Sequence, residues 1–381
     1  GISSAVIVVF FLVYTASALA SGGKLFHTVF NVDYHIALLI GAAVILTYTF
    51  LGGFLAVCTT DFIQGTLMLV GLLVVPIIAY ALVSGDFMGA LTASGISDTS
   101  SYMSLFYVNG EPYTFTQIIS DLAWGFGYCG MPHILVRFMA VKSEKELKKS
   151  SVIAIIWVAI SLFAACAIGV IGRAYLNATL SDSATETVFI AMIKQIFSNG
   201  FVLVFIGGIF LCGILAAVMS TADSQLLVCA SSVSKDIYKN ILDPKADDKK
   251  VLTISRITVI VISILAFLIA WDPNSSIMDL VSDAWAGLGS AFGPLVVCSL
   301  FWKRTNLPGA VAGILSGGLF VIIWDYLPII KGQTCYAFTG IYSLLLGFFV
   351  SLLCIVIVSL ITKAPEQGIL DEFEKVNDYQ E

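Results

Sequence analysis

The chain has 381 residues, of which 59% are apolar and only 12% are charged, and its formal net charge is −6. Because about a quarter of the residues of an ordinary soluble protein are charged, this composition excludes a soluble multidomain enzyme and predicts a polytopic membrane protein. The acidic balance, without a basic stripe or an aromatic-basic platform, excludes a nucleic-acid-binding protein.

Apolar segments follow one another along the chain, most of them near the roughly twenty residues that cross a bilayer core of about 30 Å. The ten segments are 2–21, 36–57, 61–84, 116–139, 151–172, 201–231, 257–271, 279–300, 307–326 and 337–361. Backbone groups in hydrocarbon must satisfy their own hydrogen bonds, and no alternating ten-residue strands occur, so we expect helices. The expected fold is an all-α integral membrane domain over residues 1–362.

Residues 363–381 form a polar tail, in which Leu370, Phe373 and Val376 either support a short surface helix or belong to a frayed end.

The basic residues predict the orientation of the chain in the membrane. If residue 1 is cytoplasmic and the segments alternate, 15 of the 19 Lys and Arg residues face the cytoplasm, and the external loop 85–115 has none. This distribution follows the positive-inside rule and predicts a multi-pass protein of the cell membrane with both ends of this chain in the cytoplasm.

The fourth segment contains WGFGYCGMPHILVRF (124–138), in which three glycines precede Pro132. Proline removes a hydrogen-bond donor and opposes the preceding turn, and each glycine weakens a helix. We therefore expect this helix to break, as helices do beside the binding sites of transporters. Trp124 and Tyr128 lie one turn apart and could line a pocket together. The alternative is a kink that only packs helices.

The sixth segment carries polar groups within an apolar run. In LAAVMSTADSQ (215–225), Ala217, Ser220, Thr221 and Ser224 share one helix face, and Asp223 flanks it. Hard cations such as Na⁺ prefer hydroxyl, carbonyl and carboxylate oxygens, and a charge within a membrane segment usually marks an ion path. The alternative is that the hydroxyls bond back to carbonyls of their own helix or join neighbouring helices.

Four stretches together resemble the sodium/solute symporter family, most closely its sodium/proline branch. They are LTYTFLGGFLAVCTTDFIQG (46–65), WGFGYCGMPHILVRFMA (124–140), ILAAVMSTADSQLLVCASS (214–232) and DAWAGLGSAFGP (283–294), the last of which is glycine-rich enough for close helix packing. The resemblance implies a leucine-transporter-type inverted-repeat fold, of which this chain is expected to lack the first three helices. It implies a symporter that imports a small amino acid, proline first, by alternating access in the lipid bilayer, with Na⁺ as coupling ion and no cofactor.

The same resemblance implies roles for individual residues. Sodium would bind the carbonyl of Ala217 and the hydroxyls of Ser220 and Thr221. Asp61 matches an aspartate near the intracellular ion path and, with Asp223 and Ser224, could frame a second cation site. Because Asp61 follows Thr59 and Thr60, the alternative is that it N-caps the third segment.

The substrate pocket maps onto Trp124, Tyr128 and Pro132, with Tyr14 as a further candidate, and Gly127 and Gly130 map onto hinges. The chain has Cys129 and Met131 where the proline branch has Phe and Gln, so another small amino or organic acid is an alternative substrate.

No HExxH, GxGD or GxSxG stretch occurs, and we expect no enzyme. An inactive truncated fragment and a membrane sensor on a transporter scaffold are the remaining alternatives, although the tail 363–381 has only 19 residues.

Overall fold

The computed structural model describes residues 1–51, 54–83, 85–108, 110–177, 179–180 and 182–378, except the side chains of residues 50–58, 182–183 and 377–378. Eight helices in this part of the chain are long and apolar enough to cross a membrane. They are α1 (Ile2–Phe30), α3 (Phe54–Leu82), α9 (Glu144–Leu176), α11 (Phe201–Ser231), α12 (Asp248–Ile269), α13 (Ile277–Phe301), α14 (Leu307–Tyr326) and α16 (Ser343–Ile361). The π-helix η3 (Ser232–Leu242) continues α11 without interruption.

Shorter elements connect these helices. They are α2 (Tyr34–Leu51), α4 (Phe87–Ala93), α5 (Thr99–Tyr102), the strands β1 (Tyr107–Val108) and β2 (Glu111–Pro112), α6 (Phe115–Leu122), α7 (Trp124–Gly127), the 3-10 helix η1 (Tyr128–Gly130), α8 (Pro132–Met139), the 3-10 helix η2 (Asp182–Thr187), α10 (Val188–Ile196), α15 (Cys335–Thr339) and α17 (Gln367–Asp378). The antiparallel pair β1–β2 is a small exception to the all-α expectation.

Eight of the ten expected segments form the long helices. The second forms α2, whose described apolar part, Tyr34–Thr49, is shorter than these, and the fourth is broken. The tenth segment was predicted to begin at residue 337, but the long helix α16 begins only at Ser343. The preceding short helix α15 ends at Gly340, which lies in the left-handed region at φ 66°. The tail does form a surface helix, α17.

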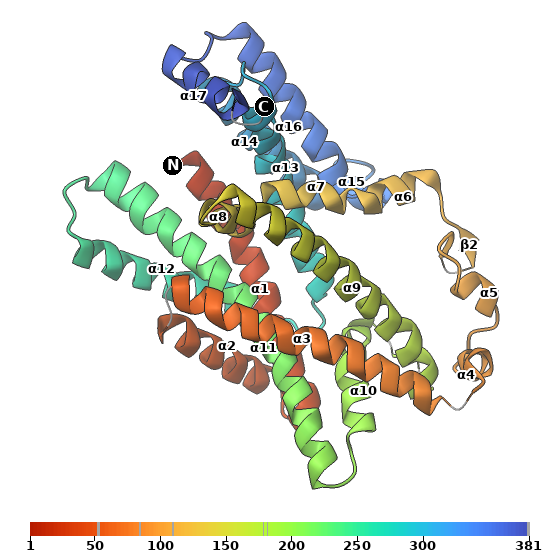
Figure 1. Ribbon diagram of the computed structural model, residues 1–381. Helices are drawn as coiled ribbons and strands as arrows, with labels where there is room; N and C mark the ends of the chain where they lie inside the picture. The colour runs from red at the N-terminus through yellow and green to blue at the C-terminus, as the bar shows by residue number, and fades with distance from the viewer. Residues whose placement is uncertain (52–53, 84, 109, 178, 181, 379–381) are drawn as a thin grey trace.

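Helix α1 runs through the middle of the molecule and contacts α2, α11, α12 and α13 (Figure 1). Its buried residues form two hydrophobic clusters, one with α13 around Phe10 and Phe11 and one with α2 around Leu19. Small residues allow the second contact: a Cβ added to Gly41 of α2 would lie 3.2 Å from the backbone of Gly22. Close backbone approach at small residues is the usual way in which membrane helices pack.

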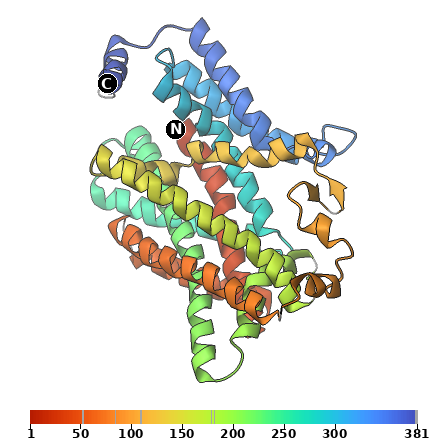
Figure 2. The ribbon, with the colours of Figure 1, turned by 45° about the vertical axis from the view of Figure 1, so that its right-hand side comes forward.

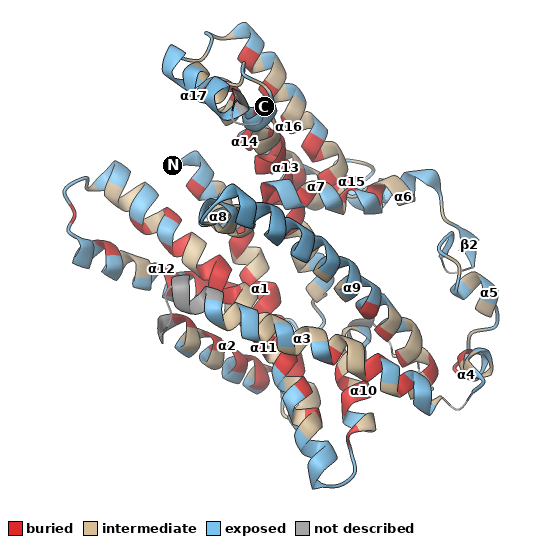
Figure 3. Cartoon of the chain, viewed as in Figure 1, coloured by how far each residue is buried: buried red, intermediate tan, exposed pale blue. Residues whose placement is uncertain are grey.

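The burial pattern separates packed helices from peripheral ones (Figure 3). Buried residues concentrate on α1 and α13, whereas α9 is largely exposed, as expected of a helix that faces lipid. Figures 1 and 2 both show α9 running alongside α3. Val75, Ile168 and Phe210 belong to a third cluster, which joins α3, α9, α10 and α11.

A buried ion pair ties three distant segments together near the end of α1. The ammonium of Lys24 lies 2.6 Å from the Glu186 carboxylate of η2 and donates to the Ser275 carbonyl at 2.8 Å. Glu186 also accepts the amide of Met278 in the first turn of α13 at 3.1 Å. Burial raises the pKa of Glu186, but the hydrogen bonds from Lys24 and from the amides of Met278 and Ile277 outweigh it and hold that pKa below its usual range.

Glu186→Gln is expected to destabilise the detergent-solubilised protein at pH 7 by about 1–3 kcal/mol, between the values for exposed and fully buried ion pairs. Since the pKa of Glu186 is lower in the folded state, its contribution is complete above about pH 4.3 and is lost as the pH falls through the folded pKa. Thermal unfolding of both proteins between pH 7 and pH 3 measures this, with the exposed Glu366→Gln as control. A difference that stays constant down to pH 3 would contradict the assignment.

Candidate functional site

The fourth segment breaks where its sequence predicts. The helix α7 ends at Gly127 and passes through one 3-10 turn to Met131, which is extended at φ −86° and ψ 107°. Proline drives the preceding residue out of the helical region, and Pro132 then occupies the first turn of α8, where its missing N–H costs little. Local chemistry alone therefore explains the interruption.

Glycines let the broken helix approach α13 closely. A Cβ added to Gly130 would lie 2.7 Å from the carbonyl oxygen of Leu288, and one added to Gly289 would lie 2.8 Å from the Cα of Gly127. This confirms the close packing predicted for the glycine-rich stretch of α13. Gly127 has helical backbone angles, φ −61° and ψ −33°, so the contact alone explains the glycine there. A hinge role for Gly127 and Gly130 stays a prediction.

The predicted substrate residues gather around this break. Trp124 and Tyr128 both contact Trp285 of α13: the Trp124 ring is stacked at 5.2 Å between centroids, and the Tyr128 ring meets it edge-on at 5.0 Å. The ring of Tyr14 lies 6.2 Å from that of His133, the residue after Pro132. Trp285 was not among the predicted site residues, although a tryptophan within a run of glycines was a usable signal.

Trp124 has a second aromatic neighbour and lines a cavity. Its ring stacks on Tyr342 at 6.0 Å. A cavity of about 520 Å³ lies beside these two rings, and Asp283 and Tyr326 also line it. Tyr128 is absent from its lining, so this cavity is not a pocket that Trp124 and Tyr128 share.

The predicted sodium residues lie together on α11. The hydroxyls of Ser220 and Thr221 both donate to the carbonyl oxygen of Ala217, each at 3.0 Å. Back-bonding is therefore present, as the alternative interpretation expected. It leaves the lone pairs of both hydroxyl oxygens available, and sodium binding stays a prediction. Among the described residues, no three His, Cys, Asp or Glu side chains are grouped as metal ligands.

Asp61 has a different partner from the one expected. It lies inside α3, seven residues after Phe54, so the N-cap interpretation is wrong because the helix begins earlier. Its carboxylate forms an ion pair with Arg137 of α8 at 2.6 Å, and Arg137 also donates to the Ser224 hydroxyl at 2.9 Å. The guanidinium thus lies between two of the groups that were predicted to frame a second cation site.

Asp223 completes the polar region of α11. It is fully buried and accepts a hydrogen bond from the hydroxyl of Thr49. One carboxylate oxygen of Asp223 and one of Asp61 are buried without a hydrogen-bond partner in the described part of the chain. Arg137 was missed in the sequence analysis as a site residue, although a charged residue near the end of an apolar segment was the signal.

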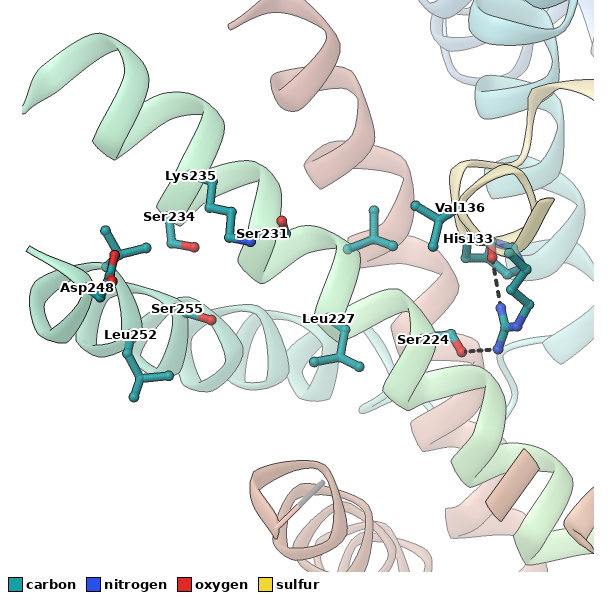
Figure 4. Close-up of a pocket in the computed structure, with 13 residues that line it drawn as sticks. His133, Val136, Ser224, Leu227, Ser231, Ser234, Lys235, Asp248, Leu252 and Ser255 are labelled. Atoms are coloured by element: carbon teal, nitrogen blue, oxygen red, sulfur yellow. Dashed lines mark hydrogen bonds between the residues drawn. The ribbon is translucent and has the colours of Figure 1, made fainter. Parts of the chain in front are cut away.

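A cavity of about 610 Å³ extends from this network (Figure 4). His133 and Ser224 lie at one end, and the cavity follows one face of α11 and η3 through Ser231 to Lys235. Arg137, which donates to Ser224, also lines it. Asp248 and Ser255 of α12 line the opposite wall. A partly polar path therefore leads from the Arg137 network along α11.

Comparisons with known proteins agree with this geometry. The family model described as "Sodium:solute symporter family" matches residues 1–317. The chain belongs to the sodium:solute symporter family. The sodium/proline symporter of Staphylococcus aureus is 42% identical over 99% of this chain and 72% of its own length. The osmoregulated proline transporter of Bacillus subtilis is 41% identical over 96% of this chain and 71% of its own length.

A solved structure supports the fold of this sodium:solute symporter family member. It is a Na⁺-coupled sialic acid symporter in a substrate-bound outward-open state, with a TM-score of 0.72 and 18% identity, covering 96% of this chain and 75% of that one. The predicted family and leucine-transporter-type fold are confirmed. The family and the apolar helices together indicate a multi-pass membrane transporter rather than an enzyme.

Proposed function

We propose that this protein is a sodium-coupled symporter that carries L-proline into the cell by alternating access. The observation that carries the proposal is the 42% identity to a sodium/proline symporter over 99% of the chain. The local geometry is compatible with it: an oxygen-bearing face of α11 and a broken helix with aromatic side chains lie in one membrane domain. Na⁺ is the coupling ion, and no cofactor is needed.

In this proposal, the Ala217 carbonyl and the hydroxyls of Ser220 and Thr221 contribute oxygens to the sodium site, because a hard cation prefers such ligands. Asp61, Asp223 and Ser224 line the path by which sodium leaves. The free carboxylate oxygens of the two aspartates support this role, since each can accept a passing cation. Arg137 occupies the Asp61 side of that path until the ion arrives.

The substrate lies at the break, against Trp124, Tyr128, Pro132 and Tyr14. Aromatic faces suit the apolar pyrrolidine ring of proline. The positive end of α8, which begins at Pro132, favours a carboxylate. Another small amino or organic acid is the second candidate, because the exposed Cys129 next to Tyr128 carries a small side chain. The buried Met131 belongs to the hydrophobic cluster against which Trp124 and Tyr14 pack, so it can influence this choice through the shape of the pocket.

Sodium drives transport through linkage. If sodium stabilises the state in which the substrate site is complete, substrate stabilises sodium binding by the same factor. One charge that moves through about 100 mV releases about 2.3 kcal/mol. At 1.36 kcal/mol per tenfold, the voltage alone supports roughly a fifty-fold gradient of substrate, and the sodium gradient adds to it.

The direct test is uptake of radiolabelled L-proline by membrane vesicles that contain the intact protein, with sodium or choline at equal ionic strength. We expect an initial rate at least about tenfold higher with sodium, as the coupling energy allows. Equal rates in the two salts would overturn sodium coupling. Sodium-dependent uptake of another small acid, with no proline uptake, would overturn only the substrate. Rates no higher than those of protein-free vesicles would favour an inactive fragment.

A further inference from the structure

Trp285 connects α13 to both aromatic residues of the broken helix. Its side chain is 5% exposed, and its indole N–H donates to the carbonyl oxygen of Trp124 at 3.0 Å. The rings of Trp124 and Trp285 are tilted by only 16°, whereas the Tyr128 ring is nearly perpendicular to Trp285 at 83°. The side chain of Trp285 therefore contacts the backbone of α7 and the rings of Trp124, at the start of α7, and of Tyr128, just after its end.

The indole has little freedom to move. A Cβ on Gly127 would run into it, so the backbone of the broken helix already lies directly against the ring. A buried indole N–H needs an acceptor, and a hydrogen bond is directional. The bond to Trp124 therefore sets the register of α7 against α13, and the two ring contacts set where Trp124 and Tyr128 lie.

Helix α13 itself is held at several points. Its first turn is bound to Glu186 through the amide of Met278, and the hydroxyl of Tyr342 donates to the carbonyl of Ser282 at 2.7 Å. Every residue of this helix from Ala284 to Pro294 is buried. The helix provides a firm base from which one side chain can position its neighbours.

We propose that Trp285 is a positioning residue of the substrate site: its N–H and its ring hold Trp124 and Tyr128 in the arrangement that binds substrate. This inference rests on the proposed function. It does not require Trp285 to touch the substrate. The sodium residues Ser220 and Thr221 lie on α11, so a change at Trp285 should act on substrate affinity and spare sodium affinity.

Trp285→Phe tests the hydrogen bond, because phenylalanine keeps an aromatic ring and lacks the N–H. We expect the KM for proline at saturating sodium to rise about fivefold to tenfold, the factor that corresponds to about 1–1.4 kcal/mol for a lost buried hydrogen bond. The KM for sodium at saturating proline should stay within about twofold. If Trp285 had only a structural role, the variant would contain less folded protein, but the KM for proline would not rise more than the KM for sodium.

Trp324→Phe is the matched control. The indole of Trp324, on α14, also donates to a carbonyl, that of Ile341, at 3.0 Å, and its ring stacks on Phe320 at 5.3 Å. This variant loses the same kind of bond, but to an acceptor outside the broken helix. Its KM for proline should therefore remain within about twofold of the unmodified value.

Labelling of the exposed Cys129 with a maleimide, read by mass spectrometry, gives a second measurement that does not depend on transport. Proline should protect Cys129, and Trp285→Phe should shift the protecting concentration by the same factor as KM. An unchanged protecting concentration, or equal shifts in the Trp285 and Trp324 variants, would overturn the inference. Failure of the proposed function would instead appear in the unmodified protein, which would lack sodium-dependent uptake.

Discussion

Thr221→Ala is expected to raise the sodium concentration for half-maximal uptake by at least about tenfold. Hydrogen bonds to charged groups contribute about 1.5–3 kcal/mol, and a lost cation ligand should cost a similar amount. Substrate binding at saturating sodium should change much less, because Thr221 lies on α11 and the aromatic residues lie on the broken helix. Initial uptake rates over a range of sodium concentrations, and substrate binding at high sodium, measure the two effects.

Two variants make this experiment specific. Thr221→Ser keeps the hydroxyl and should retain most of the sodium affinity. Thr66→Ala removes another back-bonded threonine, whose hydroxyl donates to the Phe62 carbonyl at 2.8 Å on the exposed side of α3, and should leave sodium dependence unchanged. If Thr221→Ala also retains the original sodium dependence, the sodium assignment of the α11 face is refuted.

Arg137→Gln should have a large effect on stability and a distinctive effect on sodium. The variant leaves the Asp61 carboxylate without its positively charged partner. The side chain of Asp61 is only 19% exposed and that of Arg137 is 37% exposed, so this ion pair is partly buried. Breaking a fully buried pair costs about 3–5 kcal/mol; with this partial exposure we expect about 2 kcal/mol. The guanidinium also occupies oxygens of Asp61 and Ser224 that a cation could use, so sodium should stabilise the variant more than the unmodified protein.

Thermal unfolding in detergent with sodium or choline measures both effects. The double variant Asp61→Asn/Arg137→Gln should recover part of the lost stability, since no unpaired charge remains, and should lose the extra sodium response. Arg173→Gln is the control, because within the described part of the chain Arg173 donates to the neutral Ser94 alone, at 2.6 Å to its carbonyl. Equal sodium responses in the Arg137 and Arg173 variants would show that the guanidinium does not compete with a cation.

Features with local causes could be predicted from the sequence. The break before Pro132 follows from proline and glycine chemistry within eight residues, and the oxygen face around Thr221 follows from helical periodicity. The N-cap alternative for Asp61 failed because the apolar residues before it were assigned to the preceding segment, whereas α3 already begins at Phe54. Element boundaries in continuous apolar sequence have few local signals.

Partners that are distant in sequence could not be predicted. Asp61 and Arg137 are 76 residues apart, and Trp285 lies 161 residues from Trp124. Periodicity identifies the face on which a side chain lies, but the partner of that face depends on how the helices pack. The glycines of α13 indicated close packing without identifying the broken helix as the neighbour.

The uninterrupted passage from α11 into η3 has a mechanical consequence. The combined helix, Phe201–Leu242, carries the sodium oxygens near its middle and Lys235 near its end. By helix rise, Leu242 lies about 30 Å along the rod from Thr221. If the combined helix tilts as one body by about 10° at Thr221, Leu242 moves by about 5 Å over that length. Sodium binding near Thr221 could in this way widen or narrow the end of the cavity at Lys235, because a small rotation at the ion site becomes a larger displacement at the end of the helix.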